Sequence, residues 1–191
     1  MNICVYGASS STIDKIYIQE VERLGEVIAE RGHGVVFGGG ASGCMGAAAR
    51  GARRRGGAVL GVAPTFFNVD GVLFPDCTDF ISTETMRERK YYLEEKSDGF
   101  VISPGGIGTF DEFFEILTLK QLARHNKPIV IFNVNGYYDS ILRMMEESIE
   151  KDFVQEGVRE LYAVLDDAEQ VVRYIEEYDQ PQRPVSFYKK V

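Results

Sequence analysis

A glycine-rich turn followed by a carboxylate is the feature of the sequence that points most directly to chemistry. Segment 104–112 reads PGGIGTFDE and follows the short apolar run 100–102. Three of its glycines, Gly105, Gly106 and Gly108, leave backbone N–H groups open to a ligand above the turn. The helix expected to begin here adds about half a positive charge at its N-terminus. The segment therefore predicts a site for an anion, most simply a phosphate.

Glu112 has two alternative roles in this segment. In a capping box, Thr109 is the N-cap and Glu112 reaches back to its N–H. Otherwise Glu112 acts on the ligand, since a carboxylate beside an anion site is electrostatically unfavourable unless it has a task there. The segment by itself leaves both roles open.

A second helix start brings cations together. Segment 85–90 reads TMRERK and places Arg87, Arg89 and Lys90 within about one turn. Cations at a helix N-terminus oppose the macrodipole, so a bound anion would balance them. A solvated charge cluster is the structural alternative.

These segments together resemble the LOG ("lonely guy") family, the cytokinin riboside 5′-monophosphate phosphoribohydrolases, historically labelled lysine decarboxylases. The pairing of MxxRK with PGGxGTxxE carries the resemblance. It extends to the glycine-rich segment 38–46 and to segments 121–128 and 135–138. These motifs follow one another in order, and the resemblance covers roughly residues 1–165.

The resemblance implies a catalytic pair and a set of binding residues. Arg89 and Glu112 match the functional arginine and glutamate of the family, whereas the role of Arg87 stays open because many members carry His there. The residues that match substrate-binding positions are Ser9, Ser10, Gly39, Gly40, Gly43, Met45, Lys90, Gly105, Gly106, Ile107, Gly108, Thr109 and Asp111.

The implied reaction is hydrolysis of the N-glycosidic bond of an N6-modified adenosine 5′-monophosphate. The products are the free base, a cytokinin, and ribose 5-phosphate. The resemblance further implies a homodimer, because relatives build the pocket at a subunit interface. The aromatic segment 63–78 would lie on the base side, where Asp70 is a candidate for an acidic contact of the family.

Two other functions fit the same motifs. One is a general purine or pyrimidine nucleoside 5′-monophosphate nucleosidase. The other is a non-catalytic carrier of a nucleotide or of the molybdenum cofactor on the same fold. A carrier needs the phosphate turn but not both Arg89 and Glu112, so their joint presence favours the enzyme. The old lysine decarboxylase label is rejected, since no lysine lies in a setting that suggests a Schiff base.

Two upstream motifs have structural alternatives as well. Gly38-x-Gly40-x-x-Gly43 satisfies the dinucleotide pattern GxGxxG, but it follows the second expected strand and lacks the acidic residue after the next one. Close backbone approach to a smaller nucleotide, or simply a tight turn, explains it better. Near the end of the first expected strand, Ser11 is predicted to be the N-cap of the following helix.

Composition restricts the setting of the protein. A net charge of −8 over 191 residues argues against nucleic acid or a membrane surface as a partner. Three widely spaced cysteines and two distant histidines support neither disulfides nor a metal, and no cofactor is expected. The sequence shows neither a signal peptide nor an apolar run near the ~20 residues that span a bilayer, which predicts a cytoplasmic protein.

Short apolar runs alternate with helical patterns along the chain. Strands are expected at 2–6, 34–37, 58–62, 79–82, 100–102, 128–132 and 161–164, and helices at 13–30, 43–54, 86–96, 110–123, 137–149 and 167–177. This alternation predicts a doubly wound, Rossmann-like α/β fold with a parallel sheet flanked by helices on both faces. We expect one domain over residues 1–178 and an extended or disordered tail over 179–191.

Overall fold

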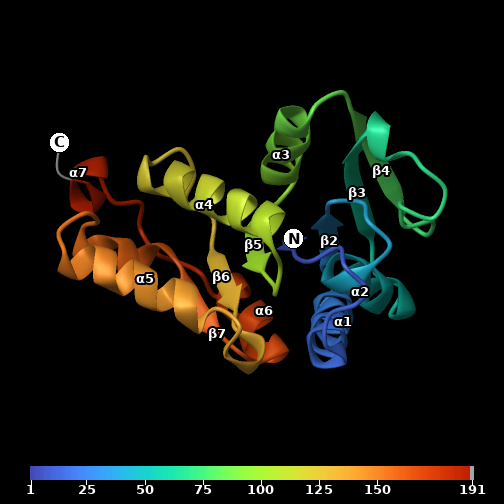
Figure 1. Ribbon diagram of the computed structural model, residues 1–191, viewed down its shortest axis with the longest axis horizontal. Helices are drawn as coiled ribbons and strands as arrows, with labels where there is room; N and C mark the ends of the chain where they lie inside the picture. Colours follow the sequence, from blue (N-terminus) through green and yellow to red (C-terminus); the bar gives the residue numbers. More distant parts are fainter. Residues whose placement is uncertain (190–191) are drawn as a thin grey trace.

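One parallel sheet organises the computed structural model, which describes residues 1–189 (Figure 1). Its seven strands lie in the order β4-β3-β2-β1-β5-β6-β7. They are β1 (Asn2–Tyr6), β2 (Gly34–Phe37), β3 (Val59–Pro64), β4 (Asp79–Thr83), β5 (Gly99–Ile102), β6 (Ile129–Phe132) and β7 (Ala163–Leu165). The predicted doubly wound α/β fold is confirmed.

Helices cover both faces of the sheet and enclose two apolar clusters. Helices α1 (Lys15–Glu30), α2 (Gly43–Arg54) and α6 (Ala168–Glu176) pack on one face, and α3 (Met86–Glu95), α4 (Ile107–Gln121) and α5 (Asp139–Glu150) on the other. Short helical segments η1 (Thr65–Phe67), η2 (Val134–Gly136), η3 (Glu156–Leu161) and α7 (Val185–Tyr188) lie in the connections and the tail.

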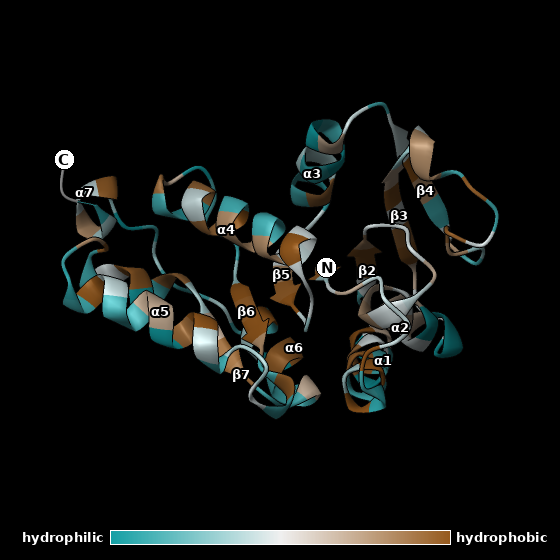
Figure 2. Cartoon of the chain, in the orientation of Figure 1, coloured by the Kyte–Doolittle hydropathy of each residue, from teal (hydrophilic) through white to brown (hydrophobic). Residues whose placement is uncertain are grey.

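The central strands are apolar along their length because the sheet is covered on both sides. Strands β2 (GVVF), β5 (GFVI) and β6 (IVIF) are buried at every residue. In Figure 2 they form the apolar centre of the molecule, with the polar positions on the outer surfaces of the helices. Such continuous runs, rich in β-branched residues, are what a parallel sheet between two helical layers requires.

Four helix starts differ from those predicted, and at α1 and α4 the difference changes which residue is the N-cap. Helix α1 begins at Lys15 with Asp14 as its N-cap, whose side chain accepts a hydrogen bond from the N–H of Ile16 at 3.1 Å, so Ser11 is not the cap. Helix α4 begins at Ile107, three residues before the predicted start at 110. Ile107 is 83% exposed, so a search for buried apolar periodicity misses the first turn.

The tail is more ordered than predicted. Residues 179–184 have no regular secondary structure, but Val185–Tyr188 form the short helix α7, and Tyr188 is buried. Its backbone carbonyl accepts a hydrogen bond from Nε2 of Gln121, at the end of α4, at 3.2 Å. The buried Tyr188 side chain and this hydrogen bond anchor the tail. Residues 190–191 lie outside the described part of the chain. Within residues 1–189, no helix is long and apolar enough to cross a membrane.

Helices α1 and α2 pack with their backbones in close contact. A Cβ atom built on Gly25 of α1 would lie 2.1 Å from the carbonyl oxygen of Ala48 in α2. In the opposite direction, a Cβ on Gly51 of α2 would lie 2.0 Å from the carbonyl oxygen of Glu22. Backbone cannot give way like a side-chain tip, so glycine at these positions sets the distance between the helices.

We expect Gly25→Ala to lower the free energy of unfolding by about 1–3 kcal/mol, because the added methyl group overpacks this interface. Gly108 lies in the first turn of α4, and a Cβ atom added there would have nothing within 4 Å, so it offers a matched control. Gly108→Ala should raise the free energy of unfolding by roughly 0.5–1 kcal/mol. Urea unfolding followed by circular dichroism measures both; a stabilised Gly25→Ala would contradict the packing described here.

Candidate active site

A cleft of about 640 Å³ lies beyond the carboxyl ends of β1, β2 and β5. Strands β2 and β5 lie on opposite sides of β1, so the strand order runs outward from β1 in two directions. Open parallel sheets bind their ligands at such a point. The residues that line it are Gly7, Ala8, Ser9, Ser10, Gly38, Gly40, Ala41, Ser42, Met45, Phe67, Gly71, Val72, Leu73, Met86, Arg89, Gly106, Ile107, Gly108, Thr109, Asp111 and Glu112.

The glycine turn after β5 is held by two tyrosines. The hydroxyl of Tyr137 donates to the carbonyl oxygen of Gly105 at 2.6 Å, and that of Tyr138 to the carbonyl oxygen of Ser103 at 2.7 Å. A Cβ atom on Gly105 would meet Oγ1 of Thr109 at 2.1 Å, so the turn also packs tightly against its own helix. These contacts explain why the 135–138 segment accompanies the glycine turn in the sequence.

Two helix N-termini without side-chain caps border the cleft. Ser42 is the N-cap of α2 and Gly106 that of α4, and neither provides a side-chain hydrogen bond to its helix. Neither helix carries an acidic residue in its first turn. Elsewhere, Thr85 caps α3 and Asp167 caps α6 with their side chains. The open N–H groups at the cleft can therefore bind an anion.

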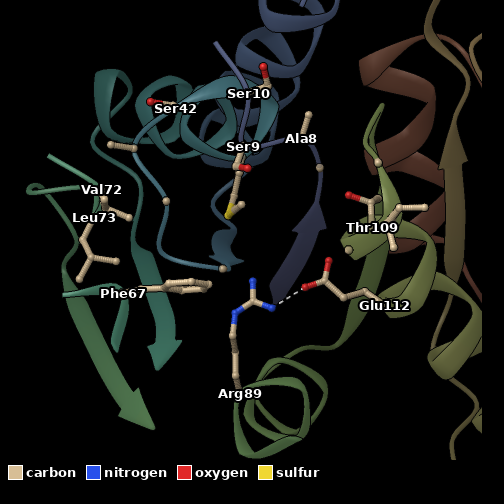
Figure 3. A pocket seen from close by; sticks show the side chains of 18 of the residues that line it. Ala8, Ser9, Ser10, Ser42, Phe67, Val72, Leu73, Arg89, Thr109 and Glu112 are labelled. Atoms are coloured by element: carbon tan, nitrogen blue, oxygen red, sulfur yellow. Dashed lines mark hydrogen bonds and ion pairs between the residues drawn. The ribbon is translucent and has the colours of Figure 1, made fainter. Parts of the chain in front are cut away.

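A buried ion pair forms the floor of the cleft (Figure 3). Nη1 of Arg89, on α3, donates to Oε1 of Glu112, on α4, at 2.6 Å, and Nε of Arg89 donates to the carbonyl oxygen of Val62 at 3.3 Å. Arg89 is 5% exposed and Glu112 8%. Burial raises the pKa of the Glu112 carboxyl above its ordinary value of 4.5, although the Arg89 guanidinium acts to lower it.

The capping-box role of Glu112 is wrong, because α4 has Gly106 as its N-cap and Thr109 lies inside the helix. The Glu112 carboxylate is directed at Arg89 instead. The ion pair also accounts for the predicted excess of positive charge at the start of α3. Arg89, one of these cations, is balanced by Glu112 rather than by a bound anion.

Lys90 is balanced in the same way. Its Nζ lies 3.0 Å from Oδ2 of Asp111 and 2.5 Å from Oε2 of Glu115, so it bridges α3 to two acids of α4. Helix α3 is thus fixed to α4 by two sets of charges, one beneath the cleft and one beside it. Arg87 is exposed and lines no part of the cleft.

Most of the predicted site residues come together here. The cleft is lined by Arg89, Glu112, Ser9, Ser10, Gly40, Met45, Gly106, Ile107, Gly108, Thr109 and Asp111. Four predicted residues, Gly39, Gly43, Lys90 and Gly105, are not part of this lining. Gly43, for example, has a positive φ of 62°, and a Cβ there would lie 2.4 Å from the carbonyl oxygen of Ala8.

An apolar wall opposite Glu112 was only partly foreseen. Phe67, Val72 and Leu73 lie across the cleft from Thr109 and Glu112 (Figure 3). Phe67 belongs to the aromatic segment expected on the base side, whereas Val72 and Leu73 carry no sequence signal of their own. Asp70 is exposed and does not line the cleft.

Backbone pairing with the second glycine segment brings this wall into place. The N–H of Ala41 donates to the carbonyl oxygen of Val72 at 2.9 Å, and the N–H of Phe74 to that of Gly39 at 2.8 Å. The sequence pattern gives no sign of these contacts, because the segments that make them lie about 30 residues apart along the chain. The completed cleft has open helix N-termini, a buried carboxylate–guanidinium pair and an apolar wall.

The fold and the cleft define an open parallel α/β protein whose cleft lies where the strand order runs in opposite directions from β1. The family model described as "Possible lysine decarboxylase" matches residues 45–175. A cytokinin riboside 5′-monophosphate phosphoribohydrolase of Arabidopsis thaliana is 33% identical, over 92% of this chain and 83% of the relative. One from Mycobacterium tuberculosis is 34% identical, over 90% and 91%. The chain belongs to this family, the LOG family, as its motifs predicted.

The solved structures agree on the fold. The molybdenum cofactor carrier protein of Chlamydomonas reinhardtii matches with a TM-score of 0.70 over 92% of this chain and 96% of that one. The identity is 21%, so this likeness concerns architecture alone.

The surroundings of Glu112 set an expectation for its titration. Because its folded-state pKa is raised, its contribution to stability is fully present below 4.5 and is lost as the pH rises through the folded pKa. Arg89→Ala removes the cation that lowers this pKa, so the pKa should rise further. Arg87→Ala removes an exposed neighbouring cation and should leave the pKa of Glu112 unchanged. Carbon-13 NMR of the Glu112 side chain, assigned with Glu112→Gln, measures all three; a lowered pKa in Arg89→Ala would contradict this account.

Proposed function

We propose that this chain hydrolyses the N-glycosidic bond of a nucleoside 5′-monophosphate, with an N6-modified adenosine 5′-monophosphate as the preferred substrate. The buried Arg89–Glu112 pair beside two uncapped helix N-termini is the observation that carries the proposal. The chain also belongs to a family whose relatives are named phosphoribohydrolases, which supports the same reaction.

The 5′-phosphate would bind at the open end of α4. Backbone N–H groups from Gly106 to Thr109 line the cleft there, and Ser9, Ser10 and the N-terminus of α2 lie nearby. These contacts are remote from the bond that breaks, so their binding energy can serve to place the sugar over Glu112.

Bond cleavage needs negative charge near the sugar. As the C1′–N bond breaks, its electron pair leaves with the base, and the sugar develops oxocarbenium character. The Glu112 carboxylate stabilises that positive charge, acting either as a transient nucleophile or as the base that orients water. Water supplies the hydroxyl group at C1′, and its proton ends on the base. Arg89 stays protonated, so it holds charge on the substrate or leaving base rather than donating a proton.

The apolar wall would receive the base. Phe67, Val72 and Leu73 offer hydrocarbon surface on the side of the cleft opposite Glu112. A hydrocarbon substituent on the base would gain about 0.8 kcal/mol for each CH₂ group buried against this wall. This favours a modified adenine over the unmodified base.

We further propose a cytoplasmic homodimer. Ile107 at the edge of the cleft and Tyr91 on α3 are large, exposed and apolar or aromatic, which fits contact with a second copy near the site. The cysteines Cys4, Cys44 and Cys77 are odd in number and widely spaced along the sequence, which supports a reducing compartment. Analytical ultracentrifugation tests the assembly, and a monomer at micromolar concentration would refute it.

The reaction is tested by incubating the purified protein with AMP, GMP, CMP and N6-isopentenyl-AMP and separating free base and ribose 5-phosphate by chromatography. We expect base release from the prenylated nucleotide far above that from AMP. Comparable release from unmodified nucleotides would make the protein a general nucleotide nucleosidase. Binding without release would make it a carrier.

Glu112→Gln should keep the fold, because glutamine can still accept the hydrogen bond from Arg89, and should lower kcat by at least about 10²-fold. Glu147→Gln, which changes an exposed acid of α5 outside the cleft, is the control and should retain turnover. For the wild type, the acid limb of kcat/KM should lie above 4.5, because burial raises the pKa of Glu112. Unchanged kcat in Glu112→Gln removes the carboxylate from the mechanism.

A further inference from the structure

Gly38, the residue after β2, lies directly against the guanidinium group of Arg89. A Cβ atom built on Gly38 would lie 1.9 Å from Nη2 and 3.1 Å from Cζ of Arg89. Ordinary van der Waals contact begins at 3.4 Å, so Nη2 would have to move by about 1.5 Å to make room. The present position of Arg89 therefore depends on the absence of a side chain at 38.

The backbone itself does not require glycine at this position. Gly38 is absent from the glycines with positive φ, whereas its neighbour Gly39 has a φ of 79°. Gly39 is also crowded, since a Cβ there would meet Cβ of Ala63 at 3.1 Å. The two adjacent glycines thus serve different needs: Gly39 allows the turn, and Gly38 leaves space for Arg89.

The guanidinium has little freedom to avoid a new methyl group. Nη1 is held by Glu112 at 2.6 Å and Nε by the carbonyl oxygen of Val62 at 3.3 Å, while Nη2 faces Gly38. Met45 closes the same corner, because its Sδ would lie 2.9 Å from the added Cβ. A shift of Nη2 must rotate or withdraw the planar group, which moves Nη1 away from Glu112.

We propose that Gly38 is a positioning residue for catalysis: the space above its Cα holds the Arg89 guanidinium in line with Glu112. This assigns the first glycine of the 38–40 run to the arrangement of the catalytic pair rather than to the phosphate. The inference rests on the proposed function for its effect on turnover, and on geometry alone for its effect on the ion pair.

A double-mutant cycle tests this assignment. Gly38→Ala in the otherwise unchanged chain should lower kcat/KM by roughly 10²-fold, the effect of misplacing a catalytic group by about 1 Å. In the Arg89→Ala background the guanidinium is gone and the flexible Met45 side chain can move into the space it leaves, so Gly38→Ala should change the residual kcat/KM less than about twofold. If Gly38 served the phosphate or only the turn, its effect would persist without Arg89, and the proposal would fail.

A second measurement is independent of turnover. Displacing Arg89 should raise the pKa of Glu112 in Gly38→Ala, as read by carbon-13 NMR, and add nothing in Arg89→Ala. An unshifted pKa in Gly38→Ala overturns the inference even in an active enzyme. If the wild type releases no base but this shift is present, the proposed function fails and the positioning role of Gly38 stands.

The same double-mutant cycle includes a control for loss of folding. Should Gly38→Ala alone fail to fold, the double variant Gly38→Ala, Arg89→Ala must fold and melt within a few degrees of Arg89→Ala. If the double variant also fails to fold, the added methyl group clashes with something other than Arg89, and the inference is wrong.

Discussion

The buried ion pair between Arg89 and Glu112 is the contact on which the arrangement of the site depends. Two charged groups removed from water lose several kcal/mol of hydration each, and only close, well-directed hydrogen bonds recover that loss. Their position at the carboxyl ends of the strands requires α3 and α4 to meet at a fixed separation. The second contact between these helices, from Lys90 to Asp111 and Glu115, lies further from the cleft and helps to maintain that separation.

The sheet and its turns provide the fixed frame that such a pair needs. Strand β5 is central and buried at every residue, and the turn that follows it is bonded to Tyr137 and Tyr138. The backbone proposed to bind the ligand is therefore held by side chains that do not line the cleft. In the proposed mechanism the substrate would contact this turn, and the less regular segment after β3 would set the specificity for the base.

The sequence was most informative where one local pattern determines the outcome. Alternating apolar runs predicted all seven strands, with ends within a few residues of those observed. The start of α4 was misplaced because Ile107 is an exposed apolar residue, and burial periodicity cannot register a residue that faces a cleft. For the same reason the pattern offers Thr109 as a possible N-cap, although Gly106, which has no side chain, occupies that position.

The parts that could not be predicted depend on contacts between distant segments. No local pattern places Val72 and Leu73 in the cleft; they arrive there because the segment pairs with Ala41 and Gly39. Likewise, only three-dimensional proximity reveals that Gly38 lies against Arg89. Motif spacing identified the chemical groups, but their mutual orientation follows from the packing of the two helical layers.

The hydroxyl groups of Tyr137 and Tyr138 make the glycine turn more suited to an anion than to a cation. Peptide groups present a donor and an acceptor, so an exposed turn would attract cations through its carbonyl oxygens as readily as anions through its N–H groups. Here the oxygens of Ser103 and Gly105 are already occupied by phenolic hydrogens. With these acceptors engaged, the turn offers mainly hydrogen-bond donors, so a neutral stretch of backbone would favour an anion over a cation.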